Sequence, residues 1–292
     1  MSALFIAEVS SNHHQSIDRC YQFIDSAAEI GCQAVKFQLF RIDQLFTQDV
    51  ISSNIDIQNR VQWELPLEFL PLIAERCKKN KILFGCTPFY IDAVGYLSPY
   101  VDFFKIASYE LLWLNLISAS AKTTKPLILS SGMANIDEIK EAIKVAKNNN
   151  CNNLSLLHCV SGYPTPLEQC NLKAISTLKS LDKDIKIGWS DHSKNPDVLY
   201  RAINHWNAQI IEFHLDLDGE GGEYRSGHCW LPNEIEPVIN STKSFELIDA
   251  RGKERFLGTL PEARTELRNR NKPLDSLILS KYLDKYAETD NC

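Results

Sequence analysis

The sequence predicts an α/β fold of the (β/α)₈ class, the closed parallel sheet known as a TIM barrel. Short apolar runs alternate eight times with amphipathic stretches along the chain. Eight such units in roughly 250 residues match the usual size of this barrel. A doubly wound open sheet is the structural alternative, but no strand-linked GxGxxG fingerprint favours it. No Gly/Ser/Pro-rich linker divides the chain into two domains either.

The predicted strands are short runs with apolar and β-branched character. In chain order they are Leu4–Ser10, Ala34–Phe40, Ile82–Phe89, Phe103–Ser108, Pro126–Gly132, Leu154–Val160, Asp184–His192 and Gln209–Asp216. The clearest helices are Ser16–Ile30, Pro66–Asn80, Asn135–Asn149, Leu172–Leu181, Asn195–Asn207 and Pro232–Asp249. Ser16 and Asn135 are N-cap residue types, and Gly31 is suited to end the first helix. We expect a barrel over residues 1–256 and a charged helical tail over residues 257–292.

The composition is that of an ordinary globular protein, with 44% hydrophobic and 23% charged residues in a chain of 292. The formal net charge is −6 and no long Lys/Arg run occurs, which excludes nucleic acid and anionic membranes as expected partners. The nine cysteines are odd in number, show no paired CxxC spacing and follow no secretory leader. They predict reduced thiols and a cytoplasmic location.

Two of the predicted strands, Asp184–His192 and Gln209–Asp216, carry a histidine near the C-terminal end. A stretch long enough for one crossover helix separates them, so they are expected to be parallel neighbours that bring His192 and His214 together. Two imidazoles in this position could hold a divalent transition ion. Three carboxylates lie close in sequence: Asp191, Glu212 and Asp216. The alternative is that each histidine is a hydrogen-bonded structural residue.

Polar side chains recur in the C-terminal halves of strands that should be apolar on both faces. They include Glu8, Lys36, Gln38, Thr87, Lys105, Ser108, Glu110, Ser130, Ser131, His158, Ser161, Tyr163 and Ser190. In a barrel these groups converge on the C-terminal mouth, where such folds place their chemistry. Two lysines among hydroxyl groups suit a compact anion that carries a phosphate and a carboxylate. The structural alternative is that both lysines form buried salt bridges with Glu8.

Nine motifs in order resemble those of the N-acetylneuraminate (sialic acid) synthase family. They are Ile6-Ala7-Glu8 with Ser11-Asn12-His13, Ala34 to Gln38, Thr87-Pro88-Phe89, Lys105 to Ser108, Leu129 to Met133, Leu157 to Ser161, Tyr163 to Pro166, Ser190-Asp191-His192 and Glu212-Phe213-His214. The resemblance implies a barrel that condenses phosphoenolpyruvate with an open-chain amino sugar. It also implies a divalent ion, Mn²⁺ first, with Mg²⁺ or Co²⁺ as alternatives.

Matching positions imply a role for each residue. His192 and His214 would hold the metal. Lys36, Thr87, Lys105 and Ser108 would bind chiefly the carboxylate end of phosphoenolpyruvate, and Ser130 and Ser190 its phosphate. Gln38, Glu110 and Tyr163 would face the sugar, and Glu8 would handle a proton or water near the metal.

The sequence departs from the family pattern at three places. Ser161 stands where the family commonly has Asn, which weakens one expected phosphate contact. The segment after His214 differs, so that Glu223 is a candidate for the acidic sugar-binding position and His228 for the family's histidine. The sequence ends where the C-terminal antifreeze-like domain of the family, with its sugar-binding arginine, would begin. A homodimer or a separately encoded capping domain is therefore a possible partner.

Two further functions are open at this stage. A Schiff-base aldolase or lyase could use Lys105 or Lys36 as its nucleophile. Alternatively, the barrel could bind a phosphorylated metabolite without turnover, or act only with a capping partner.

Overall fold

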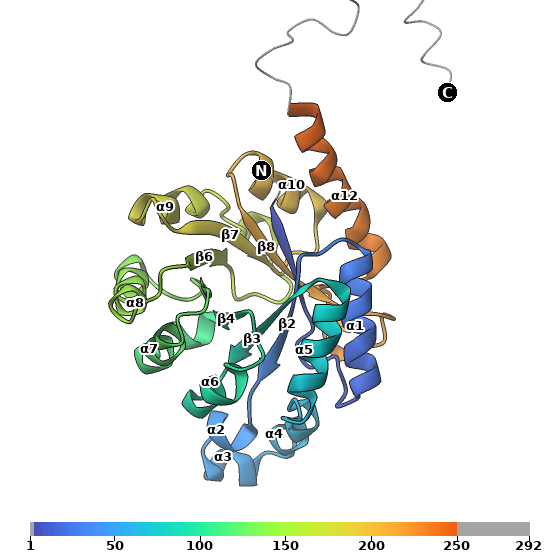
Figure 1. Cartoon of the computed structure of the whole chain (residues 1–292), viewed down its shortest axis with the longest axis vertical. Coiled ribbons are helices and arrows are strands. Elements are labelled where there is room, and N and C mark those ends of the chain that lie inside the picture. The colour runs from blue at the N-terminus through green and yellow to red at the C-terminus, as the bar shows by residue number, and fades with distance from the viewer. Residues whose placement is uncertain (1–2, 250–292) are drawn as a thin grey trace, which may run out of the picture. The chain divides into compact units, whose positions relative to one another are not determined.

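The computed structural model describes residues 3–249, and the side chains of residues 3–243. Eight parallel strands, in the order β1 to β8, form a barrel that closes through the pairing of β1 with β8 (Figure 1). The strands are β1 Leu4–Glu8, β2 Ala34–Leu39, β3 Leu83–Pro88, β4 Phe103–Ile106, β5 Leu127–Ser130, β6 Leu154–Cys159, β7 Lys186–Asp191 and β8 Ile210–Leu215. This confirms the predicted (β/α)₈ barrel.

Helices follow the barrel strands along the chain. They are α1 Ile17–Glu29, α5 Phe69–Asn80, α6 Ile91–Leu97, α7 Leu114–Lys122, α8 Ile136–Asn148, α9 Ala174–Leu181, α10 Pro196–Asn204 and α12 Pro232–Asp249. The two predicted N-caps are confirmed: Ser16 accepts a hydrogen bond from the Arg19 amide, and Asn135 forms a capping box with Glu138. No helix within residues 3–249 is long and apolar enough to cross a membrane. The tail predicted over residues 257–292 lies outside the described residues.

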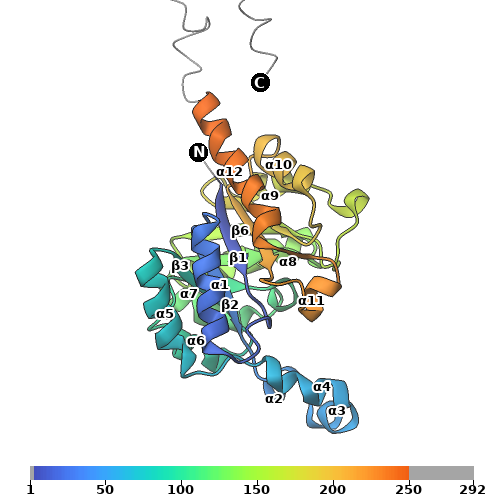
Figure 2. The same ribbon diagram turned by 90° about the vertical axis from the view of Figure 1, so that its right-hand side faces the viewer.

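A helical excursion between β2 and α5 was not predicted. It comprises α2 Ile42–Leu45, α3 Gln48–Ser53, α4 Ile55–Asn59 and the 3₁₀ turn η1 Arg60–Trp63. It leaves the C-terminal end of β2 and stands away from the barrel (Figure 2). None of these segments contains a buried residue, so their apolar side chains do not join the core of the barrel.

The interior of the barrel is divided into an apolar layer and a polar layer. Six inward-pointing side chains near the N-terminal ends of the strands form a closed cluster: Ile6, Ala34, Phe103, Ile128, Leu157 and Ile210. Gly85 is required here because a Cβ at this position would lie 2.1 Å from the Phe103 ring. This apolar floor places the polar residues of the same strands at the C-terminal mouth.

Smaller elements complete the mouth. The 3₁₀ turns η2 Ser108–Glu110 and η3 Leu167–Gln169 follow β4 and β6, and α11 Gly222–Arg225 follows β8. A two-residue strand, β9 Cys229–Trp230, pairs in parallel with the C-terminal end of β8.

Candidate active site

Buried polar side chains from seven of the eight barrel strands lie above the apolar floor. They are Glu8 on β1, Lys36 on β2, Thr87 on β3, Lys105 on β4, Ser130 on β5, Ser190 on β7 and Glu212 on β8. Each of the first six was predicted as a site residue. Their common placement follows from strand alternation. Five of them lie two residues beyond a side chain of the apolar floor, and Thr87 and Ser190 lie two residues beyond Gly85 and Gly188.

The two lysines are held by two glutamates. Lys105 Nζ donates to both carboxylate oxygens of Glu212, at 2.8 and 3.0 Å. Lys36 Nζ forms an ion pair with Glu8, donates to Thr87 Oγ1 at 2.8 Å and lies 3.9 Å from Glu212 Oε1. The cluster is therefore balanced, with two positive and two negative groups.

Electrostatics keep Lys36 and Glu212 ionised. Burial disfavours the charged form of Lys36, but Glu212 and Glu8 outweigh it and hold the pKa of Lys36 above its usual value. Burial likewise disfavours the Glu212 carboxylate, but Lys105 and Lys36 hold the pKa of Glu212 below its usual value. Lys36 is therefore an ammonium group at neutral pH, suited to attracting an anion rather than to acting as a nucleophile.

Three serines and a glycine form a niche beside the lysines. The Oγ atoms of Ser130 and Ser161 are buried without a hydrogen-bond partner. A Cβ on Gly132 would lie 2.7 Å from both Ser108 Oγ and Ser161 Oγ, so only glycine fits between them. Because a buried hydroxyl without a partner costs about 1–3 kcal/mol, the two free hydroxyl groups mark a place for a polar ligand.

The two predicted metal-binding histidines lie close together. The ring centroids of His192 and His214 are 5.3 Å apart, with the planes at 63°. An ion about 2.1 Å from a ring nitrogen lies about 3.2 Å from that ring's centroid, so two imidazoles at a tetrahedral angle have centroids about 5 Å apart. Burial, with the neighbouring His214, lowers the pKa of His192 to about 3, so this ring is neutral and able to bind a cation. Burial disfavours the charged form of His214, but Cys229 and Glu223 outweigh it and hold the pKa of His214 above its usual value, so an ion would replace a proton on this ring. The spacing of the two rings fits a shared metal ion.

The surroundings of each histidine fix its orientation. His192 Nδ1 lies 2.9 Å from the Val160 carbonyl oxygen, which assigns the proton to Nδ1 and leaves Nε2 for a ligand. His214 Nδ1 lies 3.0 Å from Glu223 Oε2, and His228 Nε2 lies 3.6 Å from the same oxygen. Glu223 and His228, the two candidates in the divergent segment, thus both lie at the histidine pair.

The remaining predicted residues line the rim. The ring of Tyr163 is 43% exposed and lies 4.0 Å from the His192 ring, centroid to centroid. Gln38 donates to Glu8 Oε1 at 3.0 Å. Burial raises the pKa of Glu110 to about 7, and its Oε2 has no hydrogen-bond partner. Glu110 can therefore carry a proton at neutral pH.

Two carboxylates that the sequence placed near the metal have structural roles instead. Asp191 accepts hydrogen bonds from the indole Nε1 groups of Trp189 and Trp230, at 3.0 and 3.1 Å. Asp216 pairs with Arg19 at 3.3 Å and accepts from the amides of the following loop. Glu212 points to the lysines. The three carboxylates that lie close to the histidines in sequence therefore make other contacts in the structure.

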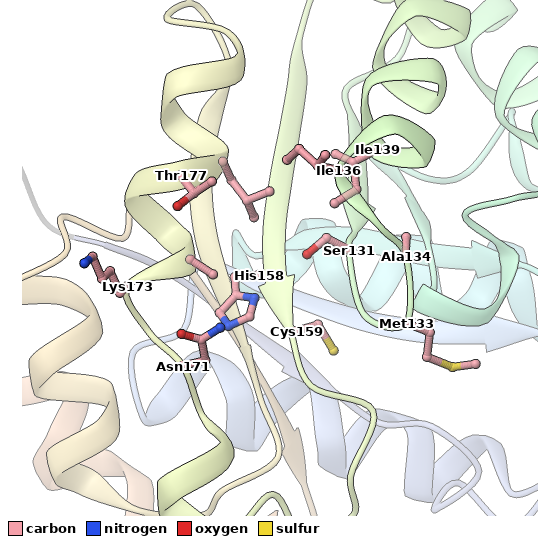
Figure 3. Close-up of a pocket in the computed structure, with 12 residues that line it drawn as sticks. Ser131, Met133, Ala134, Ile136, Ile139, His158, Cys159, Asn171, Lys173 and Thr177 are labelled. Carbon is pink, nitrogen blue, oxygen red and sulfur yellow. The ribbon is translucent and has the colours of Figure 1, made fainter.

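His158 was also expected at the mouth and is not there. Its Nε2 lies 2.9 Å from the Cys170 carbonyl oxygen, and its ring packs 5.1 Å from the Trp189 indole. It lines a cavity of about 610 Å³ between α8 and α9, together with Ser131 and Lys173 (Figure 3). His158 lies between the inward-facing positions 157 and 159, so strand alternation could have excluded it from the interior.

Comparison with known proteins gives a consistent result. The NeuB family model matches residues 23–254. Uncharacterized protein MJ1065 of Methanocaldococcus jannaschii is 36% identical over 98% of this chain and 82% of its own length. The N,N'-diacetyllegionaminic acid synthase of Campylobacter jejuni is 30% identical over 97% of this chain and 86% of its own length. The N-acetylneuraminic acid (sialic acid) synthetase of Leptospira borgpetersenii, solved with citrate, superposes with a TM-score of 0.79 at 31% identity, covering 93% of this chain and 92% of that one.

Proposed function

The chain belongs to the NeuB family, and we propose that it condenses phosphoenolpyruvate with the open-chain form of an amino sugar or related aldose. The products would be a nonulosonic 2-keto acid, similar to sialic acid, and inorganic phosphate. The observation that carries the proposal is the close placement of a two-lysine anion site and a two-histidine metal site at one barrel mouth.

Phosphoenolpyruvate fits the charge pattern of the lysine cluster. Its carboxylate would bind at Lys36, Thr87 and Lys105, taking over part of the contact that these lysines make with Glu8 and Glu212. Its phosphate would accept hydrogen bonds from the hydroxyl groups of the serine niche, Ser108, Ser130 and Ser161, with Ser190 beside them. Ligand binding thus satisfies the hydroxyl groups that lack a partner in the protein alone.

The acceptor would enter beside the histidines. A divalent ion held by His192 and His214 supplies Lewis-acid polarisation of the acceptor's aldehyde. The exposed face of Tyr163 and the amide of Gln38 border this space and would orient the sugar chain. Restricting the acceptor in this way places its aldehyde carbon near carbon 3 of the enol.

Proton transfers can be assigned to two carboxyl groups. Carbon 3 of phosphoenolpyruvate attacks the aldehyde carbon, and Glu110, protonated below about pH 7, gives its proton to the aldehyde oxygen. Water then adds to the cationic carbon 2, with Glu8 positioned to accept its proton. The hydroxyl group on carbon 2 then gives its proton to the departing phosphate, the bond between carbon 2 and the bridging oxygen breaks, and the 2-keto group forms. The positive charge of Lys36 and Lys105 stabilises the negative charge that remains on the phosphate and carboxylate groups.

A direct test is phosphate release from phosphoenolpyruvate by the full chain with a divalent ion and a panel of aldoses and N-acyl hexosamines. We expect release that depends on the sugar and is abolished by a chelator. Absence of sugar-dependent release across the panel would count against the proposal.

The charge state of the lysines weighs against the Schiff-base alternative. Imine formation needs a neutral amine, whereas Lys36 has a raised pKa and Lys105 donates to both oxygens of a buried carboxylate. Trapping of a lysine adduct by borohydride would reverse this judgement. The homodimer, the capping partner and the cytoplasmic location stay predictions.

A further inference from the structure

A group of four potential metal ligands lies on one side of His214. Its members are His214, Glu223, His228 and Cys229, and one donor atom from each lies within 4.8 Å of the others. His214, His228 and Cys229 are buried, and Glu223 is partly buried. Within residues 3–243, this is the one group of at least three His, Cys, Asp or Glu donors that meets the spacing of a metal site.

The pairing of β9 with β8 explains how these residues meet. In the parallel register, Cys229 is the direct partner of His214, so both side chains point to the same face. The short helix α11 brings Glu223 over this pair, where Ser11 Oγ donates to its other oxygen at 3.0 Å. Cys229 Sγ lies 3.9 Å from Glu223 Oε2. A strand of two residues is thus enough to place a thiol at the mouth.

The third imidazole has the spacing of a shared ligand. The ring centroid of His228 lies 4.9 Å from that of His214 and 6.3 Å from that of His192, and the His192–His214 distance is 5.3 Å. The point equidistant from these three centroids is about 3.2 Å from each, which is the distance expected when an ion is bound about 2.1 Å from a ring nitrogen. In addition, His228 Nδ1 is buried without a hydrogen-bond partner.

We propose that Cys229, with His214, Glu223 and His228, forms a thiolate-containing metal centre that takes a borderline ion of the Co²⁺, Fe²⁺ or Zn²⁺ class in preference to Mn²⁺ or Mg²⁺. The proposal deepens the proposed function and rests on it, since it names the ion class at the same mouth. Thiolate and imidazole donors select these softer ions, whereas Mg²⁺ and Mn²⁺ prefer oxygen ligands. Binding replaces the S–H bond of Cys229 by an S–metal bond and one N–H bond of the protonated His214 ring by an N–metal bond, and both protons go to solvent.

His192 borders this group, with its ring centroid 5.3 Å from that of His214 and 6.3 Å from that of His228. As a fifth donor it would still leave a six-coordinate ion one position for an aldehyde oxygen or water, which is what the proposed condensation requires. The thiolate would also lower the net charge of the centre and so weaken its pull on anions other than the substrate held by the lysines.

The test uses cobalt as a spectroscopic probe without substrate. The full chain is stripped of metal with a chelator and titrated with Co²⁺ without oxygen, while its near-ultraviolet and visible absorption is recorded. We expect a thiolate-to-Co²⁺ charge-transfer band that saturates at one ion per chain. Zn²⁺ should displace the Co²⁺, and an equal concentration of Mn²⁺ should leave the band unchanged.

Three variants assign the band. Cys229→Ser should remove it and weaken Co²⁺ binding at least tenfold, since loss of even an outer-shell partner costs about 10–100-fold in affinity. Cys151→Ser, which removes a buried free thiol in the α8–β6 connection, should keep it. Cys159→Ser should also keep it, although Cys159 Sγ lies 4.0 Å from His192 Nδ1.

The outcomes separate this proposal from the proposed function. Co²⁺ binding without a charge-transfer band, or a band lost in Cys159→Ser but kept in Cys229→Ser, would overturn the thiolate centre even if the enzyme turns over. A band that depends on Cys229 would uphold it even if no sugar in the panel reacts. If Cys229→Ser does not fold, the wild-type spectrum and the Mn²⁺ competition still decide the question.

Discussion

Replacing Lys105 by Met tests the buried charge cluster most sharply. Lys105 and Glu212 are each buried, and Lys105 Nζ makes both of its short contacts to this one carboxylate. Removing one member of a buried pair leaves an uncompensated charge and typically costs 3–5 kcal/mol. In Lys105→Met the Glu212 carboxylate still has Lys36 Nζ 3.9 Å from its Oε1, so we expect a loss of stability at the lower end of this range, about 3 kcal/mol. For a barrel of this size that loss corresponds to a fall in Tm of about 6–12 °C.

A second change shows whether the loss arises from the pair. Lys105→Met with Glu212→Met removes both charges and should recover most of the stability, giving a coupling of at least about 2 kcal/mol in a double-mutant cycle. Lys144→Met is the matched control because its partner Glu141 lies with it on the exposed surface of α8. Its free energy of unfolding should change by less than about 0.5 kcal/mol.

The assay is equilibrium unfolding by denaturant, with calorimetric Tm values alongside. A loss below about 1 kcal/mol for Lys105→Met, or a double variant no more stable than the single one, would refute the pairing. Phosphoenolpyruvate affinity, measured by titration calorimetry, should fall about 10–100-fold in Lys105→Met because a charge-assisted hydrogen bond contributes about 1.5–3 kcal/mol.

Three other changes probe the remaining parts of the mouth. Because the pKa of Glu110 is raised in the folded protein, its ionisation costs stability as pH rises from about 4.5 to about 7, and Glu110→Gln should remove that decline. If the free energy of unfolding changes with pH in the same way for the wild-type protein and for Glu110→Gln, Glu110 does not titrate in this range. Ser161→Ala should not lower Tm, because it removes a buried Oγ that has no partner, but it should weaken phosphoenolpyruvate binding about tenfold in calorimetry. An unchanged affinity would remove Ser161 from the phosphate site. His192→Ala should lower the metal content of the purified chain, measured by mass spectrometry, while phosphoenolpyruvate binding at the lysines persists; full metal retention would remove His192 from the metal site.

Strand alternation made much of the mouth predictable from sequence. Lys36 and Gln38 point to the same face because they are two residues apart, and in the structure both contact Glu8. His192 and His214 could be predicted to lie close together because one crossover helix separates their strands, which makes the strands parallel neighbours. The motif resemblance then gave each position a role that spacing alone could not assign.

Other features depend on contacts between distant segments. The choice of Glu212 as the partner of Lys105 follows from the curvature of the barrel, which no local pattern reveals. The position of Cys229 depends on a two-residue strand, too short to produce a periodic signal. The unpredicted excursion over residues 42–63 consists of helices of four to six residues without buried side chains, too short for a periodic pattern to identify them.

A crystal structure of the full chain with phosphoenolpyruvate and a divalent ion would show both proposed binding sites at once. We expect the ion at bonding distance from His192 and His214, about 2.0–2.3 Å, with the carboxylate of phosphoenolpyruvate at Lys36 and Lys105 and its phosphate in the serine niche. Phosphoenolpyruvate bound away from both lysines would contradict the proposed function, and so would an ion that contacts neither His192 nor His214.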